Sequence, residues 1–129
     1  MSDLPERDLR VRTKQFAPRT IKLVDSLPRS AVGRVIGSQL LRSATSVGAN
    51  YREALRSRTA VEYASKLGIC LQELEESLYW FELIAESGLL SSARIKALMV
   101  ECDELAAIFV ALSKAAGSRP RIARDLHSS

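Results

Sequence analysis

Histidine is almost absent from this 129-residue sequence, and its scarcity excludes several kinds of catalytic and metal site. The one histidine, His127, lies in a polar C-terminal segment, so no histidine can stand beside a serine or cysteine nucleophile in a rigid core. The Glu-x-x-His pairs of di-iron helical bundles are missing for the same reason. The two cysteines, Cys70 and Cys102, lack the spacing of a zinc site and lie within apolar helical patterns. We therefore expect no catalytic residues, no metal, no cofactor and two reduced core cysteines.

Long apolar runs are also missing, and so are the features of an exported protein. No run approaches the roughly 18–20 apolar residues that cross a bilayer. The charged segment MSDLPERDLRVR contains no apolar stretch of a secretory signal. Glycine-rich phosphate loops are absent too, because Gly33, Gly37 and Gly48 fall within helical periodicity and follow no strand. We therefore expect a cytoplasmic protein without membrane contact.

Strand signals are likewise missing, whereas apolar residues recur at helical spacing along most of the chain. The pattern predicts helices over about 8–27, 31–58, 60–87 and 92–116. Pro18 predicts a kink in the first helix or a later start, Ser30 can cap the second, and Gly88 and Gly117 can end the third and fourth. Short connections favour antiparallel neighbours, so we predict an all-α, up-down-up-down four-helix bundle over residues 1–117. Residues 118–129 are predicted to be a basic, disordered tail.

Each predicted helix carries a stripe of apolar or small residues at steps of three and four, which we assign to the bundle core. The stripes of the first two helices are Val11, Phe16, Thr20, Leu23, Val24 and Leu27, and Val32, Ile36, Leu40, Ala44, Val47, Tyr51 and Ala54 or Leu55. Those of the last two are Ala60, Ala64, Leu67, Leu71, Leu74, Leu78, Phe81 and Ala85, and Ile95, Leu98 or Met99, Cys102, Leu105, Phe109, Leu112 and Ala116.

A run of small residues at 43–49, SATSVGA, occupies the middle of the second predicted helix, although serine, threonine and glycine are mediocre to poor helix formers. Small side chains let two helix backbones approach closely. The third helix has a second apolar set outside its core stripe, which consists of Tyr63, Ile69, Cys70, Tyr79, Trp80, Leu83 and Ile84. Since one bundle core does not need all this surface, we expect another subunit to cover it. The candidate interface residues are Arg42, Ser46, Gly48, Ala49, Asn50, Glu53, Tyr79 and Trp80.

The segment QLLRSATSVGANYREA, followed by KLGICLQELEESLYWFELI and ESGLL, resembles the four-helix-bundle proteins encoded in intervening sequences of bacterial 23S rRNA genes. The shared pattern comprises Gln39, Leu40, Arg42, Ser43, Ser46, Asn50 and Glu53, with Glu76, Ser77, Tyr79 and Trp80 on the next helix. The resemblance covers nearly the whole chain and implies a homopentameric ring with a central channel. It also implies a fold similar to that of the accessory protein of diversity-generating retroelements, a basic pentamer that associates with reverse transcriptase and nucleic acid.

Charge is unevenly distributed along the chain, which raises the question of an anionic partner. Residues 1–58 hold twelve basic and five acidic residues, whereas residues 59–112 hold three basic and nine acidic ones. One explanation is that helices of opposite charge partly neutralise each other's electrostatic fields within one bundle. The alternative is a basic surface that attracts RNA or DNA. Its candidate residues, expected to gather at one end of the bundle, are Arg10, Arg12, Lys14, Arg52, Arg56 and Arg58.

Two hypotheses for function follow from these patterns. The first is a non-enzymatic, homo-oligomeric helical bundle, a pentamer by resemblance, with a structural or adaptor role. The second is a nucleic-acid-binding accessory protein whose basic patch is repeated around the ring. Two further features, Trp80 and the pair Glu73 and Glu76, give only weak support to a binding site. Trp80 could stack on a base, but a core or subunit interface is favoured for it. Glu73 and Glu76 could share a cation, but a solvated or salt-bridged face is favoured for them.

Overall fold

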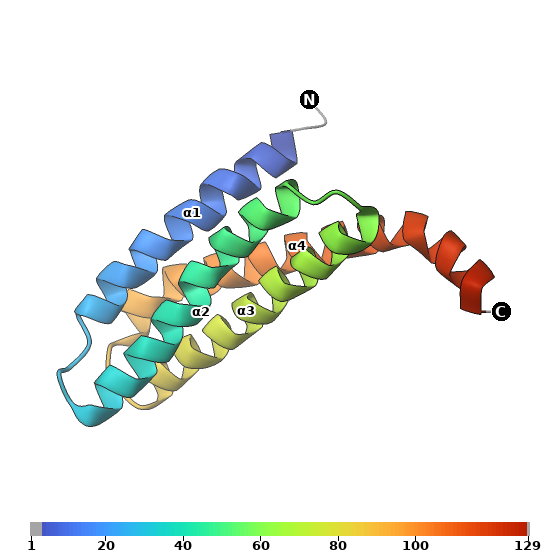
Figure 1. Ribbon diagram of the computed structural model, residues 1–129. Coiled ribbons are helices and arrows are strands. Elements are labelled where there is room, and N and C mark those ends of the chain that lie inside the picture. The colour runs from blue at the N-terminus through green and yellow to red at the C-terminus, as the bar shows by residue number, and fades with distance from the viewer. Residues whose placement is uncertain (1–3, 129) are drawn as a thin grey trace.

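The fold is all-α in the part of the chain that the computed structural model describes, which is the backbone of residues 4–128 and the side chains of residues 9–116. Its helices are α1 (Leu4–Asp25), α2 (Ala31–Leu55), α3 (Ala60–Glu86) and α4 (Ser92–Ser128), joined by short loops (Figure 1). Contacts link α1 with α2, α2 with α3, α3 with α4 and α4 with α1. This cyclic order confirms the predicted four-helix bundle.

Local signals at the loops account for most helix ends. The Ser30 hydroxyl accepts a hydrogen bond from the Gly33 backbone N–H at 3.1 Å, as predicted for the cap of α2. Thr59 caps α3 in the same way by accepting from the Glu62 N–H at 3.0 Å. Gly88 ends α3 with a φ of 69°, and the Leu89 N–H returns to the Ile84 carbonyl at 3.1 Å.

Three predicted boundaries differ from the structure. Helix α1 begins before Pro18 and continues through it, so the proline does not mark the start. Helix α2 ends at Leu55 because Arg56 leaves helical geometry. Helix α4 continues past Gly117, since a helical glycine costs only about 1 kcal/mol relative to alanine. The side chains of residues 117–129, where the disordered tail is predicted, lie outside the described part of the chain.

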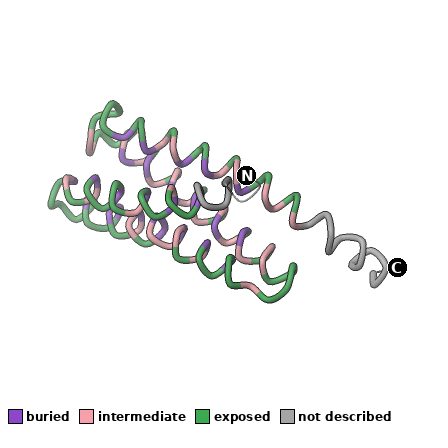
Figure 2. The backbone as a smooth tube through the Cα atoms, turned by 90° about the horizontal axis from the view of Figure 1, so that it is seen from above, coloured by how far each residue is buried: buried purple, intermediate pink, exposed green. Residues whose placement is uncertain are grey.

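Buried residues occur along the length of the bundle (Figure 2), and their side chains form one core. Its largest members are Tyr51, Phe16, Phe81 and Phe109, which meet edge to face in the pairs Phe16–Phe81 and Tyr51–Phe109. Cys70 and Cys102 are buried and unpaired, as predicted. The bundle therefore buries a conventional apolar core without any disulfide between these two cysteines.

Several core assignments are wrong, and helix rotation explains each of them. Val11 is 49% exposed and Val32 is 54% exposed. Val11 points outward because Leu9 and Thr13, two residues away on either side, face the core. At the start of α2, Gly33 is buried against the preceding loop, where a Cβ atom would collide with the Pro28 carbonyl oxygen.

Helix α3 uses more of its circumference inside the chain than the sequence suggests. Cys70 and Ile84, predicted to belong to a second apolar set, are fully buried in the core of this chain. Ala60, predicted to be a core residue, is exposed. The surface of α3 that remains for a partner is therefore smaller than predicted.

Candidate functional site

A polar network joins α2 to α3 and contains several residues predicted to lie at a subunit interface. Arg42 donates through Nη2 to Glu76 Oε2, and its Nη1 lies 3.5 Å from Glu73 Oε1. The Trp80 indole N–H donates to the same Glu76 oxygen at 3.2 Å. The hydrogen bond from Trp80, followed by that from Arg42, holds the pKa of Glu76 below its usual value of 4.5. Both carboxylates are thus salt-bridged, which confirms the interpretation favoured for Glu73 and Glu76.

Buried polar atoms continue this network under the surface. The Ser43 and Ser77 hydroxyl oxygens lie 2.8 Å apart in the core. Ser77 donates its hydroxyl proton to the Glu73 carbonyl at 2.8 Å, so the proton between the two serines comes from Ser43, whose hydroxyl also lies 3.2 Å from the Leu40 carbonyl. Part of the shared sequence pattern therefore serves to pair α2 with α3 inside one chain.

The remaining polar interface candidates of α2 follow the same edge of the helix. Ser46 donates to the Arg42 carbonyl at 2.7 Å, and the Asn50 side-chain amide donates to the Ser46 carbonyl at 2.8 Å. Glu53 forms an ion pair with Lys66 of α3 at 2.7 Å. These side chains are satisfied locally, so the structure gives each of them a partner within the chain.

Gly48 and Ala49 lie on the opposite edge of α2, beside α1. A Cβ atom on Gly48 would approach the Thr13 carbonyl oxygen to 3.2 Å. Ser43, Ala44 and Val47 are buried in the core. The expectation that the small run as a whole serves another subunit needs this correction, because much of the run packs within the chain. A further contact of Gly48 or Ala49 with a second subunit stays a prediction.

The basic candidates separate into two groups. Arg12 faces α4, where its guanidinium pairs with Glu101 at 2.7 Å and Glu104 at 2.9 Å. It therefore does not join the other cations, contrary to the predicted gathering. Arg10, Lys14 and Arg52 do come together, around adjoining hollows of about 240 and 520 Å³ between α1 and α2. Arg56 and Arg58, at the end of α2 and in the loop after it, are exposed and line neither hollow.

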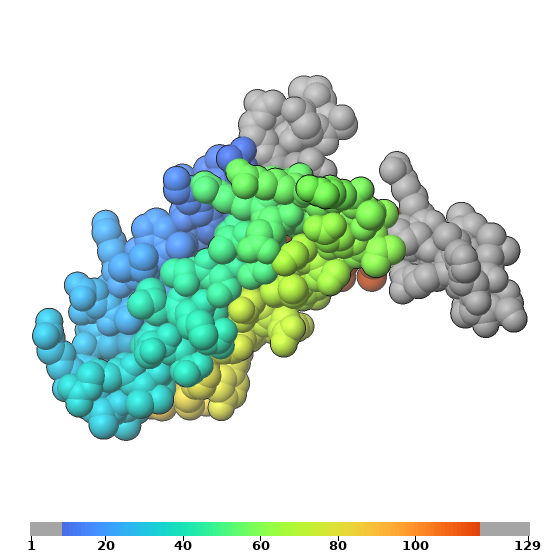
Figure 3. Space-filling view, viewed as in Figure 1, coloured from blue at the N-terminus to red at the C-terminus, as the bar shows by residue number. Residues whose placement is uncertain are grey.

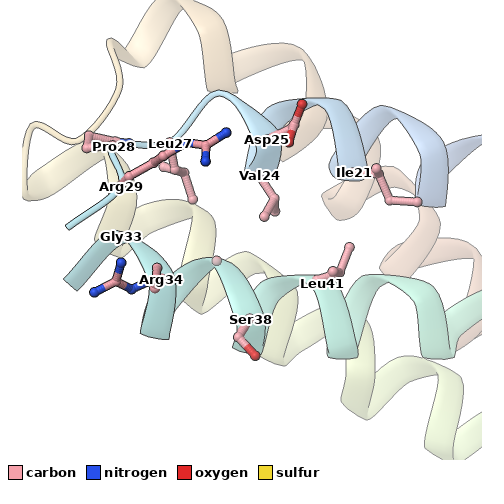
Figure 4. A pocket seen from close by; sticks show the side chains of 11 residues that line it. Ile21, Val24, Asp25, Leu27, Pro28, Arg29, Gly33, Arg34, Ser38 and Leu41 are labelled. Atoms are coloured by element: carbon pink, nitrogen blue, oxygen red, sulfur yellow. The ribbon is translucent and has the colours of Figure 1, made fainter. Parts of the chain in front are cut away.

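The groove to which these hollows belong was not predicted from the sequence. A further hollow of about 490 Å³ lies between α1 and α2 near the loop that joins them, with Ile21, Val24 and Leu41 pointing into it (Figure 4). A Cβ atom on Gly37 would meet the side chains of Leu27 and Val24 at 3.1 Å. The spacing of Gly33 and Gly37, one helical turn apart, was the available signal for this close helix pair.

Two further classes of site are not found among the described residues. No group of three or more His, Cys, Asp or Glu side chains in that part of the chain is placed to hold a metal ion. None of its helices combines the length and the apolar character needed to span a membrane.

The fold, the polar network and the hollows between α1 and α2 define an all-α four-helix bundle. Residues 7–111 match the model of the 23S rRNA-intervening sequence protein family, so the chain belongs to this family, as the resemblance predicted. It is also similar to a protein of unknown function from the S23 ribosomal protein family of Bacteroides thetaiotaomicron, whose crystal structure was solved at 1.70 Å resolution. The two chains share 28% identity with a TM-score of 0.78, over 82% of this chain and 98% of that one. A comparison with curated proteins finds no match.

Proposed function

We propose that this protein is a non-enzymatic, homo-oligomeric helical bundle that acts as a structural or adaptor module. The observation that carries the proposal is the groove between α1 and α2, whose apolar and small lining residues remain uncovered in a single chain. At the start of α2, the exposed side chains of Val32 and Val35 border a separate hollow of about 320 Å³. Apolar surface of this kind marks sites of association in soluble proteins.

Light scattering coupled to size-exclusion chromatography at micromolar concentration tests the proposal. A five-membered ring, the assembly that the family resemblance implies, would elute with five times the chain mass of 14.2 kDa. A single stable mass above that of one chain supports the oligomer, and five copies support the ring. A stable monomer over the whole concentration range would refute both.

Nucleic-acid binding is the second candidate, and the convergence of Arg10, Lys14 and Arg52 favours it. No side chain among residues 9–116 forms an ion pair with any of these three cations. Repetition of the cluster around an oligomer would strengthen its field. Binding to a mixed-sequence RNA or DNA should then weaken steeply between low and physiological salt. Absence of binding at low salt would remove this candidate.

A further inference from the structure

The groove between α1 and α2 has small residues at its base and cations at its edge in the part lined by Arg10, Lys14 and Arg52. Its floor contains Ala17, Gly48 and Ala49, and its rim contains Arg10, Lys14 and Arg52. This set of residues is called the basic groove below. Because the floor residues have little or no side chain, the hollow can accept a large side chain from outside. Because the rim cations have no acidic partner among the described side chains, an acidic occupant would satisfy them.

The outward face of α3 has the complementary properties. At steps of three and four it presents Gln72, Glu75, Tyr79, Glu82 and Glu86, all exposed, which are called the outer stripe below. Tyr79 is 56% exposed and lies edge to face with Trp80, with ring centroids 5.0 Å apart. No ion pair within residues 9–116 involves the three glutamates of the stripe. A single chain thus presents an exposed tyrosine flanked by carboxylates that form no ion pair among the described side chains.

We propose that the basic groove of one chain receives the outer stripe of a second copy, with Tyr79 over the small-residue floor and the glutamates beside Arg10, Lys14 and Arg52. This inference rests on the proposed homo-oligomer and names the surfaces that form it. Aromatic anchors in pockets commonly carry much of the energy of an interface, and opposite charges around them set partner and register.

The occupant must come from another chain because of the order of the helices. Helix α2 lies between α1 and α3 on the surface shown in Figure 3, and α1 and α3 meet only inside the core, as Phe16 and Phe81 do, among the described residues. The outer stripe therefore cannot fold onto the basic groove of its own chain. An interface between two different surfaces is heterologous, and such interfaces generate rings when the rotation closes.

Charge reversal on each side tests the pairing. One variant carries Arg10→Glu, Lys14→Glu and Arg52→Glu, and the other carries Glu75→Arg, Glu82→Arg and Glu86→Arg. Each should raise the dissociation constant of the assembly at least roughly 100-fold, because like charges would then face each other. A chain with both sets of substitutions restores opposite charges and should assemble again. Arg94→Glu and Asp103→Arg, at exposed positions of α4, are the matched controls and should leave assembly unchanged.

A cross-linking experiment gives a second readout that tolerates weakened folding of the reversed variants. Ala49→Cys places a thiol in the basic groove, and Gln72→Cys places one in the outer stripe while keeping Tyr79. The native thiols of Cys70 and Cys102 will not interfere, because they are buried and burial raises the pKa of each to about 12. A short bis-maleimide should link the two variants to each other when they are mixed, and should link neither variant to itself.

The outcomes separate this inference from the proposed function. If the unmodified protein is a monomer, both fail. If it is oligomeric but the reversed variants assemble as well as the controls do, the oligomer stands and the pairing of these surfaces is overturned. If the groove-reversed variant stays oligomeric and only loses retention on RNA or DNA, the basic groove serves nucleic acid and the inference is also overturned.

Discussion

At the scale of single residues, the helical glycines differ in what surrounds them. Gly33 and Gly48 lie against backbone atoms of the preceding loop and of α1, so a side chain at either position would push a neighbouring segment away. Gly68 lies on the outside of α3, where a Cβ atom would meet nothing within 4 Å. The same residue type therefore permits close packing against a loop at Gly33 and against a helix at Gly48, whereas Gly68 has no close neighbour among the described residues.

Replacing Gly48 by leucine should destabilise the protein by roughly 1–3 kcal/mol, because the added side chain must separate α1 from α2. The close atom is the Thr13 carbonyl oxygen, which would lie 3.2 Å from the new Cβ atom, and backbone cannot rotate away as a flexible side chain can. Thermal or urea unfolding measures the change. Gly68→Leu is the matched control and should not destabilise, since it replaces glycine in an open helical position. Equal effects of the two substitutions would contradict the close contact at Gly48.

The pH dependence of the α2–α3 network should report on Glu76. Hydrogen bonds from Trp80 and Arg42 lower the pKa of Glu76 in the folded chain. Its contribution to stability is therefore present above the ordinary carboxyl pKa and is lost as pH falls through the lowered one. Trp80 is the only tryptophan, so its fluorescence should follow this protonation with a midpoint below 4.5. Glu76→Gln should abolish the transition, and a midpoint at or above 4.5 would contradict the interaction.

At the scale of helices, the sequence predicts well which helices form and in what order. It predicts less well which side of each helix faces the core. Apolar periodicity was sufficient for all four helices, and Ser30 and Gly88 marked ends that the structure confirms. Periodicity could not reveal that Gly33 is buried, because it packs against the loop carbonyl of Pro28 and not against the core. It also could not separate Arg12 from Arg10, since the choice of neighbour depends on how α1 is rotated against α4. Long-range packing, and not local propensity, decides these features.

Helix α1 should be the most easily opened of the first three helices. It packs mainly on α2, and the ion pair between Arg12 and Glu101 joins it to α4. Arg12→Ala should therefore accelerate hydrogen exchange of α1 amides while leaving α3 protected. Arg10→Ala, which removes a cation without an ion-pair partner among residues 9–116, is the control. Uniform acceleration across all helices after Arg12→Ala would show instead that the bundle opens as one unit.

At the scale of the whole molecule, charge is segregated between faces as well as along the sequence. Helix α3 carries six glutamates and one lysine, whereas the described side chains of α1 include five cations and one aspartate. Some of this opposition is used within the chain, as in the pairing of Arg42 with Glu76. The charges of the basic groove and the outer stripe form no ion pair within residues 9–116 and can pair between chains.

Assembly through these surfaces should depend on ionic strength. Raising sodium chloride from about 0.05 M to about 0.5 M shortens the Debye length to a few ångströms and screens exposed charge pairs. The assembled fraction at a fixed micromolar concentration should fall, as measured by light scattering. The chain with both reversed charge sets should show the same salt dependence. Assembly that strengthens with salt would indicate an interface held by apolar contact alone.

The placement of two unlike surfaces on different helices has a consequence for mixtures of intact and damaged chains. A subunit whose groove is blocked still offers its Tyr79 face, so it can enter a growing array but cannot accept the next member. Such a subunit ends propagation in one direction, and a small proportion of it would stop many rings from closing. A substitution that blocks only the groove between α1 and α2 would thus impair assembly of the intact chains present with it. Complete absence of some chains would only lower the concentration of intact ones.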